Sequence, residues 1–432
     1  MTVPLRLSPG EAAARLRPVD TLGIPLGPGQ PGSLLHALGE RTDWEDLQVG
    51  GALLVDLYQL FLHPGVHHQS GFFGPAERFL LASGADIQFV PADFRRFAPV
   101  LERRSPRVMA TAAAPPDADG WCSLSLHAGA TTGELNRAGR DPERELVVEV
   151  NARLPRTLGW EDHRHAIHVD QIDVLVEADR DPFVLADAEP GPVDLAIAEL
   201  VRPFIPDGAT LQTGIGSIPS GVVGRLAEGD GGDYGIHSEM FTTGLMRLHQ
   251  AGKVTNARKG TYDGVSITTF AAGTAELYAW LDGNPDVRFL PVDVVNSPET
   301  IARNRRMITV NGALSIDLFG QVVADTLDGA QFSGIGGHED FVAATGLQLE
   351  DRSLICLPSR ATHEGQQVSR IVERLPYGSV VTTPRHQLDV VVTEHGTAEL
   401  RGRTVRERAL ALAAISDPSV RPELEAAADR MR

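Results

Sequence analysis

Positive charge and cysteine are both scarce in this chain of 432 residues. Its 57 acidic side chains outnumber 39 lysines and arginines, which gives a formal net charge of −18. A general nucleic-acid-binding protein needs a basic face, so this composition argues against nucleic acid as a partner. The two cysteines, Cys122 and Cys356, are far apart in the sequence. Two thiols make neither a disulfide framework nor a four-cysteine zinc site, so we expect a reducing cytoplasm.

Long hydrophobic runs are also missing. No stretch of about 18 uncharged apolar residues occurs, which is the length a membrane-spanning helix needs. The most apolar segment, residues 50–66, carries Asp56 and indicates buried core. The first residues, MTVPLRLSPGEAAARL, lack the apolar centre of a signal peptide. We therefore expect no membrane partner.

The length of the chain suits two domains, and 42% hydrophobic residues suffice for two cores. Residues 186–194, with Pro190, Gly191 and Pro192, are the best linker candidate. We divide the chain into domains 1–189 and 190–432. Short apolar runs alternate with helical stretches such as 95–104, a pattern that predicts an α/β fold. The predicted strands or strand ends of the first half are residues 50–62, 85–94, 143–151 and 171–179.

Two capping boxes predict where the first and the last long helical segments begin. Ser8 and Glu11 flank Pro9, which suits the first helical position. Thr404 and Glu407 form the same pattern ahead of RALALAAI.

Glycine-rich turns mark two positions in the second half. The segment TGIGSIPSG follows a predicted strand, and Gly214 and Gly216 would allow a ligand to approach the backbone closely. Pro219 breaks the dinucleotide fingerprint there, and Glu339 breaks it in SGIGGHEDF. Neither turn continues into the lysine of a P-loop. Each alone could be an ordinary tight turn, but two in one half favour a ligand site.

Glu239 is the only acidic residue between Tyr234 and Leu245. It could be a solvated charge near a helix N-terminus, where carboxylates are favoured. Its apolar and small neighbours favour a desolvated, paired or functional carboxylate instead. A carboxylate can act as a covalent nucleophile if the electrophile is activated and the oxyanion is held.

Several motifs in one order resemble the acetyl-CoA hydrolase/transferase family. The matching segments are PPDADGWCSLS (115–125), VNARLPRTLG (150–159), IHVDQIDVLVE (167–177), IPDGATLQTGIGSIP (205–219), GIHSEMFTTG (235–244), ITTFAAGTAELYAWLDGNP (267–285), VNSPETIARN (295–304), NGALSIDLFGQV (311–322), SGIGGHEDF (333–341) and VVTEHGTAELRG (391–402). They span most of the chain.

The resemblance implies a CoA-transferase built from two α/β domains of the CoA-transferase type, with the active site at their interface. It implies that Glu239 attacks an acyl-CoA thioester and ends as a glutamyl-CoA thioester. A hydrolase would use the same nucleophile, with water as the acceptor. A dinucleotide-dependent oxidoreductase is disfavoured by the broken fingerprints, and a non-catalytic CoA sensor by the presence of Glu239.

The resemblance also assigns binding residues. The CoA contacts fall on Gly214, Ile215, Gly216, Ser217, Ile218, Asn296, Leu314, Gly336 and Gly337. Glu394 and His338 are substrate-pocket candidates. His338 departs from the amide or small residue usual in the family. Arg258 and Lys259 could contact CoA phosphates or be exposed charges. LGPGQPG (26–32) is a candidate for the acceptor pocket.

The partners implied are acyl-CoA, small carboxylic acids and a second copy of the chain. CoA enters as a substrate, and we expect no permanently bound cofactor and no metal. His163, His165 and His168 have metal-like spacing, but no carboxylate or cysteine set completes a site. We expect these histidines and HPGVHH (63–68) to lie on the surface or in loops.

Overall fold

The computed structural model describes residues 3–346 and 348–431. They form an α/β fold with two compact units. Unit 1 comprises residues 3–185, 239–241 and 267–297, and unit 2 comprises the rest. The division into domains 1–189 and 190–432 counts the two short segments of unit 1 with the second domain. It remains a prediction, because the units describe packing alone.

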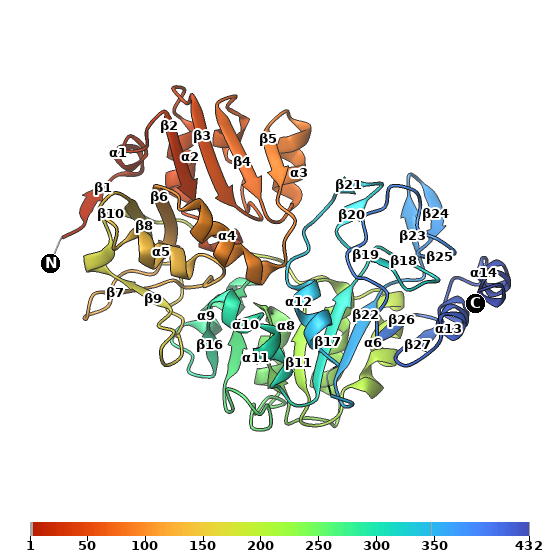
Figure 1. The fold of residues 1–432 in the computed structure, drawn as a ribbon. Coiled ribbons are helices and arrows are strands. Elements are labelled where there is room, and N and C mark those ends of the chain that lie inside the picture. Colours follow the sequence, from red (N-terminus) through yellow and green to blue (C-terminus); the bar gives the residue numbers. More distant parts are fainter. Residues whose placement is uncertain (1–2, 347, 432) are drawn as a thin grey trace. The chain divides into compact units, whose positions relative to one another are not determined.

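Unit 1 is built on an eight-stranded sheet in which every pair is parallel (Figure 1). In spatial order its strands are β1 (Leu5–Leu7), β10 (Val174–Ala178), β8 (Glu145–Asn151), β6 (Val108–Ala113), β2 (Val19–Gly23), β3 (Asp46–Gly51), β4 (Val66–Ser70) and β5 (Asp86–Phe89). The chain leaves β2 toward β5 and then returns to the other side of β2 with β6. This reversal makes the carboxyl ends of β2 and β6 a topological switch point.

Helices cover both faces of this sheet, which explains why every residue of β6 and β8 is buried. They are α1 (Pro9–Ala13), α2 (Gly32–Gly39), α3 (Pro75–Ala82), α4 (Phe97–Arg104) and α5 (Thr132–Ala138). Side chains alternate between two cores. Val108 and Val147 pack with α1, α2 and α3, whereas Met109 and Leu146 pack with α5. The predicted capping box is confirmed, since Ser8 and Glu11 bond each other's backbone N–H groups.

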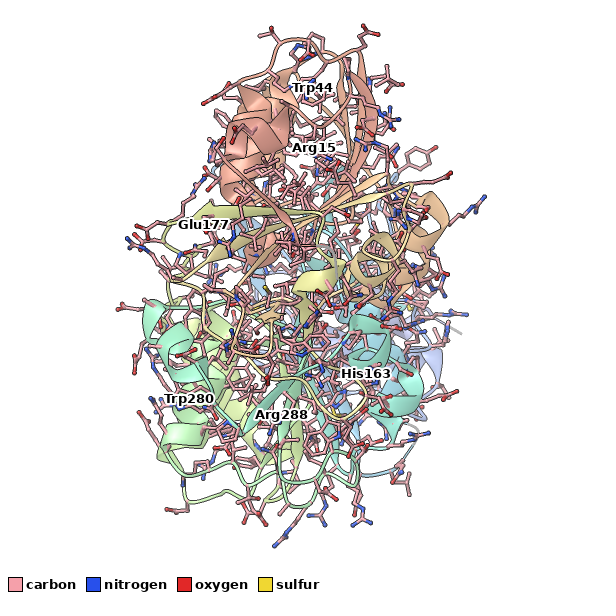
Figure 2. The ribbon with its side chains drawn as sticks, turned by 90° about the vertical axis from the view of Figure 1, so that its left-hand side faces the viewer. Arg15, Trp44, His163, Glu177, Trp280 and Arg288 are labelled. Carbon is pink, nitrogen blue, oxygen red and sulfur yellow. The ribbon has the colours of Figure 1, made fainter. Side chains whose placement is uncertain are left out.

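The remaining elements of unit 1 are short. They are β7 (Trp121–Ser123) with β9 (Ala166–His168), β13 (Met240–Phe241) with β15 (Phe270–Ala271), β14 (Ser266–Thr268) with β16 (Val287–Phe289), α9 (Ala275–Leu281) and α10 (Val292–Val295), together with the 3-10 turns Gly27–Gly29, Gln59–Leu62, Phe94–Arg96 and Val169–Gln171. Figure 2 shows Trp44 and Arg15 near one end of unit 1 and Trp280, Arg288 and His163 near the other. The predicted strand at 50–62 is wrong beyond Gly51, because the chain there turns away into a loop and a 3-10 turn.

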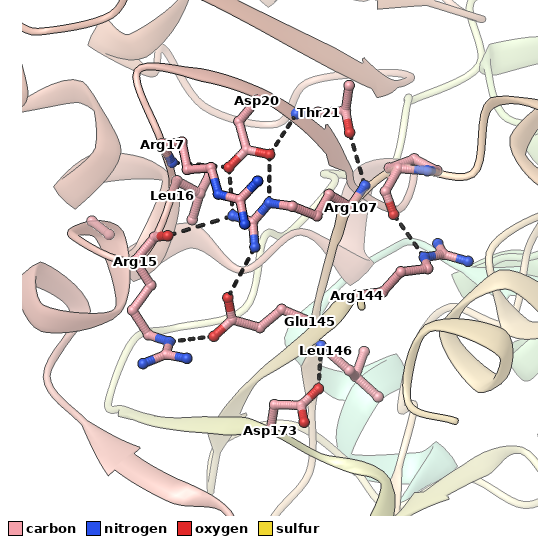
Figure 3. Close-up of polar contacts among 12 residues, drawn as sticks. Arg15, Leu16, Arg17, Asp20, Thr21, Arg107, Arg144, Glu145, Leu146 and Asp173 are labelled. Carbon is pink, nitrogen blue, oxygen red and sulfur yellow. Dashed lines mark hydrogen bonds and ion pairs between the residues drawn. The ribbon is translucent and has the colours of Figure 1, made fainter. Parts of the chain in front are cut away.

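The amino-terminal edge of the unit 1 sheet is tied together by charged side chains (Figure 3). Arg107, just before β6, donates from Nε to Oδ1 of Asp20 at 2.8 Å and pairs with Glu145 at 3.6 Å. Arg15 pairs with the same Glu145. Burial acts to raise the pKa of Asp20, but hydrogen bonds from Arg107, Arg17 and Thr21 outweigh it and leave the pKa below its usual value. This network joins the starts of β2, β6 and β8.

Unit 2 contains a six-stranded sheet. Its strands in spatial order are β12 (Gly235–Ile236), β11 (Thr210–Thr213), β17 (Met307–Gly312), β22 (Arg352–Cys356), β26 (Val390–Thr393) and β27 (Gly396–Glu399). The first five are parallel and β27 is antiparallel. The chain passes from β11 to β12 and then across to β17. This is the doubly wound order 2-1-3-4-5, with its switch point at β11 and β17.

The helices and small strands of unit 2 complete its core. They are α6 (Pro192–Val201), α7 (Ser217–Glu228), α8 (Thr243–Gln250), α11 (Pro298–Ala302), α12 (His338–Ala344), α13 (Val405–Ala414), α14 (Arg421–Asp429), the 3-10 turn Arg202–Phe204, β18 (Ser315–Asp317), β19 (Val322–Val323), β25 (Ile371–Val372) and the hairpins β20–β21 (Thr326–Leu327, Ala330–Gln331) and β23–β24 (Arg360–His363, Gln366–Ser369). Thr404 caps α13 with Glu407, as predicted. No described helix has the length and apolarity that crossing a membrane requires.

Candidate active site

Glu239 lies at a bend between β12 and β13 and is half-buried. Its main-chain carbonyl accepts hydrogen bonds from the Thr268 hydroxyl at 2.9 Å and from the N–H groups of Thr269 and Phe270 at 3.0 and 3.2 Å. Thr242, three residues later, caps α8. Thr242 and not Glu239 is therefore the cap of this helix, and the backbone of Glu239 is fixed by three donors.

The carboxylate of Glu239 is held by an asparagine. Asn296 is fully buried, and its Nδ2 donates to Oε2 of Glu239 at 2.6 Å. Asn296 itself is fixed as the C-cap residue directly after α10, where its N–H bonds the Val292 carbonyl. A neutral amide fixes the orientation of a carboxylate without neutralising its charge. This arrangement orients the carboxylate of Glu239.

The aromatic residue two positions after Glu239 anchors β13. Phe241 stacks on Trp280 of α9, with ring centroids 5.8 Å apart (Trp280 is labelled in Figure 2). Its carbonyl accepts from the N–H of Ala272 at 3.2 Å. Segments 239–241 and 268–272 therefore form one clamped element that positions Glu239.

The predicted CoA turn forms in unit 2 where the sequence indicates. Thr213 ends β11, and residues 214–216 turn directly into α7. Gly216 has φ = +117°, a conformation that only glycine adopts easily. Ile215 and Gly216 are exposed, and no side chain caps the first turn of the 12-residue helix α7. The backbone N–H groups at this helix start are available to an anionic or polar ligand.

The turn adjoins the segment that leads to Glu239. Ser238, the residue before Glu239, is fully buried and donates from its hydroxyl to the Thr213 carbonyl at 3.1 Å. The His237 N–H bonds the Leu211 carbonyl at 3.1 Å. Ser238 was not among the predicted site residues, because no sequence signal marks it beyond its place beside Glu239.

Other predicted residues of unit 2 also follow strands at the carboxyl edge of its sheet. Leu314 follows β17, and its N–H bonds the Val323 carbonyl at 2.8 Å. Glu394 follows β26 and accepts from the N–H and hydroxyl of Ser359 at 2.8 and 2.6 Å. Ligands of open α/β sheets bind at this edge. Glu394 thus secures the end of β22 as well as being a substrate-pocket candidate.

Gly336, Gly337 and His338 lead into α12. The Nε2 atom of His338 lies 2.8 Å from the Thr383 hydroxyl, which also bonds Glu339. Burial lowers the pKa of His338 to about 4, so the imidazole is neutral at pH 7. Phe341, one turn further along α12, lies against the His237 ring with centroids 6.2 Å apart. His338 is therefore an anchored neutral side chain of unit 2.

The two candidates for contacts with CoA phosphates, Arg258 and Lys259, differ in their exposure. Arg258 is exposed and pairs with Asp233 at 2.6 Å. Lys259 is 0% exposed, and its Nζ donates to the Val265 carbonyl at 2.7 Å. Burial lowers the pKa of Lys259 to about 7. Both alternatives considered for Lys259, a phosphate contact and an exposed charge, are therefore wrong.

The histidine-rich segments are only partly surface loops. His165 is buried, with Nε2 2.7 Å from the Ser125 carbonyl, whereas Nε2 of His168 lies 3.0 Å from the Asp119 carbonyl. His163 is half-buried (labelled in Figure 2). His68 is buried within β4. The expectation of a surface or loop position is wrong for His68, whereas His165 lies in a loop although it is buried. Within residues 3–346 and 348–431, no three His, Cys, Asp or Glu side chains are grouped as metal ligands.

Comparisons with known proteins show which family the chain belongs to. A family model described as the acetyl-CoA hydrolase/transferase C-terminal domain matches residues 273–428. Succinyl-CoA:cyclohexane-1-carboxylate CoA transferase of Geobacter metallireducens is 34% identical, over 98% of this chain and 95% of its own. 4-Hydroxybutyrate coenzyme A transferase of Clostridium kluyveri is 36% identical, over 83% and 80%. The crystal structure of RipA from Yersinia pestis has a TM-score of 0.90 at 32% identity, covering 99% and 97%.

The fold, the oriented carboxylate and these likenesses define an enzyme of the CoA-transferase class. The chain belongs to the acetyl-CoA hydrolase/transferase family.

Proposed function

We propose that this enzyme moves CoA between an acyl-CoA and a small carboxylic acid through a glutamyl-CoA thioester on Glu239. The observation that carries the proposal is the 2.6 Å hydrogen bond from Asn296 to Oε2 of Glu239. It fixes the orientation of the carboxylate that acts as the nucleophile. The clamped main chain at Glu239 supports the same role, because a fixed nucleophile reacts faster than a mobile one.

The reaction has two halves, the formation of glutamyl-CoA and its transfer to the second acid, and each half consists of two substitutions at a carbonyl carbon. A carboxylate oxygen of Glu239 attacks the thioester carbonyl, the carbon–sulfur bond breaks, and CoA leaves as a thiolate while a mixed anhydride forms. The thiolate then attacks the glutamyl carbonyl, the acid leaves as a carboxylate, and glutamyl-CoA remains. A second carboxylate reverses these steps. The Asn296 amide N–H can donate to the glutamyl oxygen as its negative charge develops.

We propose that CoA contacts the turn at Gly214, Ile215, Gly216, Ser217 and Ile218, with Asn296, Leu314, Gly336 and Gly337 as further contacts. The exposed turn, the φ of Gly216 and the uncapped start of α7 support this assignment. The switch point of the unit 2 sheet, where doubly wound folds bind ligands, lies at the same strand end. His338 and Glu394 remain the candidates for substrate contacts in unit 2.

The alternative activity is acyl-CoA hydrolysis, in which water takes the place of the second acid. An assay of several acyl-CoAs with and without added carboxylates separates the two. Transfer predicts a new acyl-CoA by mass spectrometry, with little free thiol, and a dependence on the carboxylate. Release of free CoA at a rate independent of carboxylate would identify a hydrolase. Neither product from any acyl-CoA would refute both activities.

We further propose that the enzyme is a cytoplasmic homodimer and that CoA is a substrate rather than a resident cofactor. The buried free thiols Cys122 and Cys356 fit a reducing compartment. Burial raises the pKa of Cys122 to about 11, so this thiol is unreactive at neutral pH. Size-exclusion chromatography with light scattering tests the dimer.

A further inference from the structure

An apolar surface in unit 1 begins at the residue that follows Glu239. Met240 pairs with Phe270 across β13 and β15. Both belong to one apolar cluster with the buried residues Leu26, Ala52, Phe94, Leu101, Ala130 and Val292. Four larger members remain partly exposed: Leu53, Phe72, Phe97 and Met240. Those four side chains are here called the apolar surface.

This surface lies at the carboxyl edge of the eight-stranded sheet. Leu53 follows β3 and Phe72 follows β4, and Leu26 of the underlying cluster follows β2. The carboxyl ends of parallel strands are where ligands bind in open α/β folds, and β2 is one of the two strands at the switch point. The position is therefore that of a ligand site.

A single helical turn links the cluster to the carboxylate of Glu239. Val292 belongs to the cluster, and Asn296 bonds the carboxylate at 2.6 Å. The two residues are separated by four positions at α10, and the Asn296 N–H bonds the Val292 carbonyl at 2.8 Å. Side chains at i and i+4 lie on the same side of a helix, about 5–6 Å apart. An acyl group bonded to Glu239 would therefore have apolar contacts within reach.

The loops that form the surface are held firmly. Glu77 is fully buried, and its carboxylate accepts from the N–H groups of Leu54 and Gly74 at 2.6 and 2.8 Å. Leu53 has φ = +46°, an uncommon conformation for a leucine. A Cβ at Gly71 would overlap the Phe97 ring, so glycine there is what allows the ring its place. The exposure of Leu53 and Phe97 is thus set by a fixed backbone.

Charge is absent from the cluster and limited around it. Arg95 and Arg96 follow Phe94 in the chain, and both pair with Asp93 at 3.1 and 3.3 Å. Arg104 lies beside Gly50, and within the described chain no carboxylate is recorded as its partner. None of the four side chains of the apolar surface can pair with a substrate carboxylate, so a carboxylate placed on them would lose hydration.

We propose that the apolar surface receives the acyl chain of the substrate, and that the enzyme prefers short hydrocarbon acyl groups to acyl groups bearing a second carboxylate. This inference rests on the proposed function, since it requires Glu239 to be the attacking group. Each methylene buried on the surface raises kcat/KM about fourfold until the surface is covered. A terminal carboxylate lowers kcat/KM instead.

The test compares propionyl-, butyryl- and succinyl-CoA with acetate as the acceptor. Butyryl- and succinyl-CoA have four acyl carbons each, so they differ by a terminal methyl against a carboxylate. We expect kcat/KM for butyryl-CoA to be about fourfold higher than for propionyl-CoA. We also expect kcat/KM for butyryl-CoA to be at least tenfold higher than for succinyl-CoA. Phe97→Arg places a cation on the surface and should raise the succinyl-to-butyryl ratio at least tenfold. Phe79→Arg, on the exposed side of α3, is the matched control and should leave the ratio unchanged.

Circular dichroism and thermal unfolding show whether each variant is folded. If Phe97→Arg does not fold, Phe97→Leu serves as the second variant. Phe97→Leu keeps an apolar surface and should alter the butyryl-to-propionyl ratio alone. A wild-type preference for succinyl-CoA that Arg104→Ala abolishes would overturn the inference and assign the site to Arg104. Equal shifts in Phe97→Arg and Phe79→Arg would overturn it as well. Absence of transfer from every acyl-CoA would overturn the proposed function and this inference with it.

Discussion

Asn296 and Glu239 are 57 positions apart in the sequence, yet a 2.6 Å hydrogen bond joins the asparagine amide to the glutamate carboxylate. The donor is buried, and the helix that carries it ends at that residue. The bond fixes the orientation of the carboxylate, so in the proposed mechanism the reactivity of Glu239 depends on Asn296.

Replacing Asn296 with alanine should lower kcat about a hundredfold, because the variant loses a donor aimed at the reacting carboxylate. Asn296→Asp should be at least as poor, since a second carboxylate would repel Glu239. Asn284→Ala is the control: Asn284 donates to the Trp280 carbonyl at 3.1 Å in the same segment. Steady-state kinetics with one acyl-CoA measures the effect. Equal rates for Asn296→Ala and Asn284→Ala would show that Asn296 has no role in the reaction.

Gly216→Val should weaken CoA binding about tenfold, because a branched residue is strained at φ = +117° and the turn must distort to relieve the strain. Gly224→Ala in the interior of α7 is the matched control, since a Cβ there meets nothing within 4 Å. That substitution should leave CoA affinity unchanged. Calorimetric titration with CoA measures both. Unchanged affinity in a folded Gly216→Val protein would remove the turn from the CoA site.

His338 should make the stability depend on pH between about 6.5 and 4. Its pKa is lowered to about 4 by burial, although the charge of Asp325 acts in the opposite direction. An unfolded histidine has a pKa of about 6.5, so in this window the unfolded chain binds a proton that the native protein does not. The native state therefore loses stability as the pH falls. His338→Gln removes this loss and allows an amide to bond Thr383.

The free energy of unfolding of both proteins, measured in urea at pH 7, 6 and 5, checks this. The difference between variant and wild type should increase in favour of the variant by up to about 1.4 kcal/mol per pH unit below 6.5. Parallel profiles would show that the imidazole is not held neutral in the native state.

Arg107→Met should reduce the free energy of unfolding by about 3 kcal/mol, because it leaves Asp20 as an unpaired buried charge. The Asp20 side chain is 2% exposed and Arg107 is 20% exposed. The pKa of Asp20 lies below its usual value, so the stability it contributes is present above about pH 4 and is lost as the pH falls further. This makes Arg107→Met a stability variant that should leave KM unchanged.

Arg6→Met provides the comparison, because Arg6 and Glu177 are 66% and 70% exposed. An exposed pair contributes less than about 1 kcal/mol. Urea unfolding at pH 7 should therefore rank Arg107→Met as far less stable than Arg6→Met. Equal losses would contradict the structural role given to the network of Figure 3.

Much of the fold follows from local sequence signals. Strands β8 and β10 are mainly apolar because helices cover both faces of their sheet, and such segments are visible in the sequence. The boxes at Ser8 and Thr404 fix helix starts through side chain–backbone bonds within three residues. The predicted strand after Gly51 was wrong because the apolar residues of this segment pack into the core from a loop and a 3-10 turn rather than from a strand.

The candidate site was predictable only in part. Glu239 stands out as one charge among apolar neighbours, and Gly216 as a glycine between a strand and a helix. The bonds from Asn296 and Thr268 to Glu239 join segments that are far apart in the sequence. No local sequence pattern therefore indicates them. The prediction that Lys259 contacts a phosphate or is an exposed charge was wrong for a related reason. A lysine at a strand end is usually exposed, but this one is buried by tertiary packing.

The covalent state of Glu239 tests the account most directly. The protein is incubated with an acyl-CoA without acceptor, treated with mild borohydride to reduce a thioester to an alcohol, and digested for mass spectrometry. The account predicts that the reduction falls on Glu239 within GIHSEMFTTG, and that Glu239→Ala is folded, unmodified and inactive. Modification of another residue, or full transfer activity in Glu239→Ala, would contradict it.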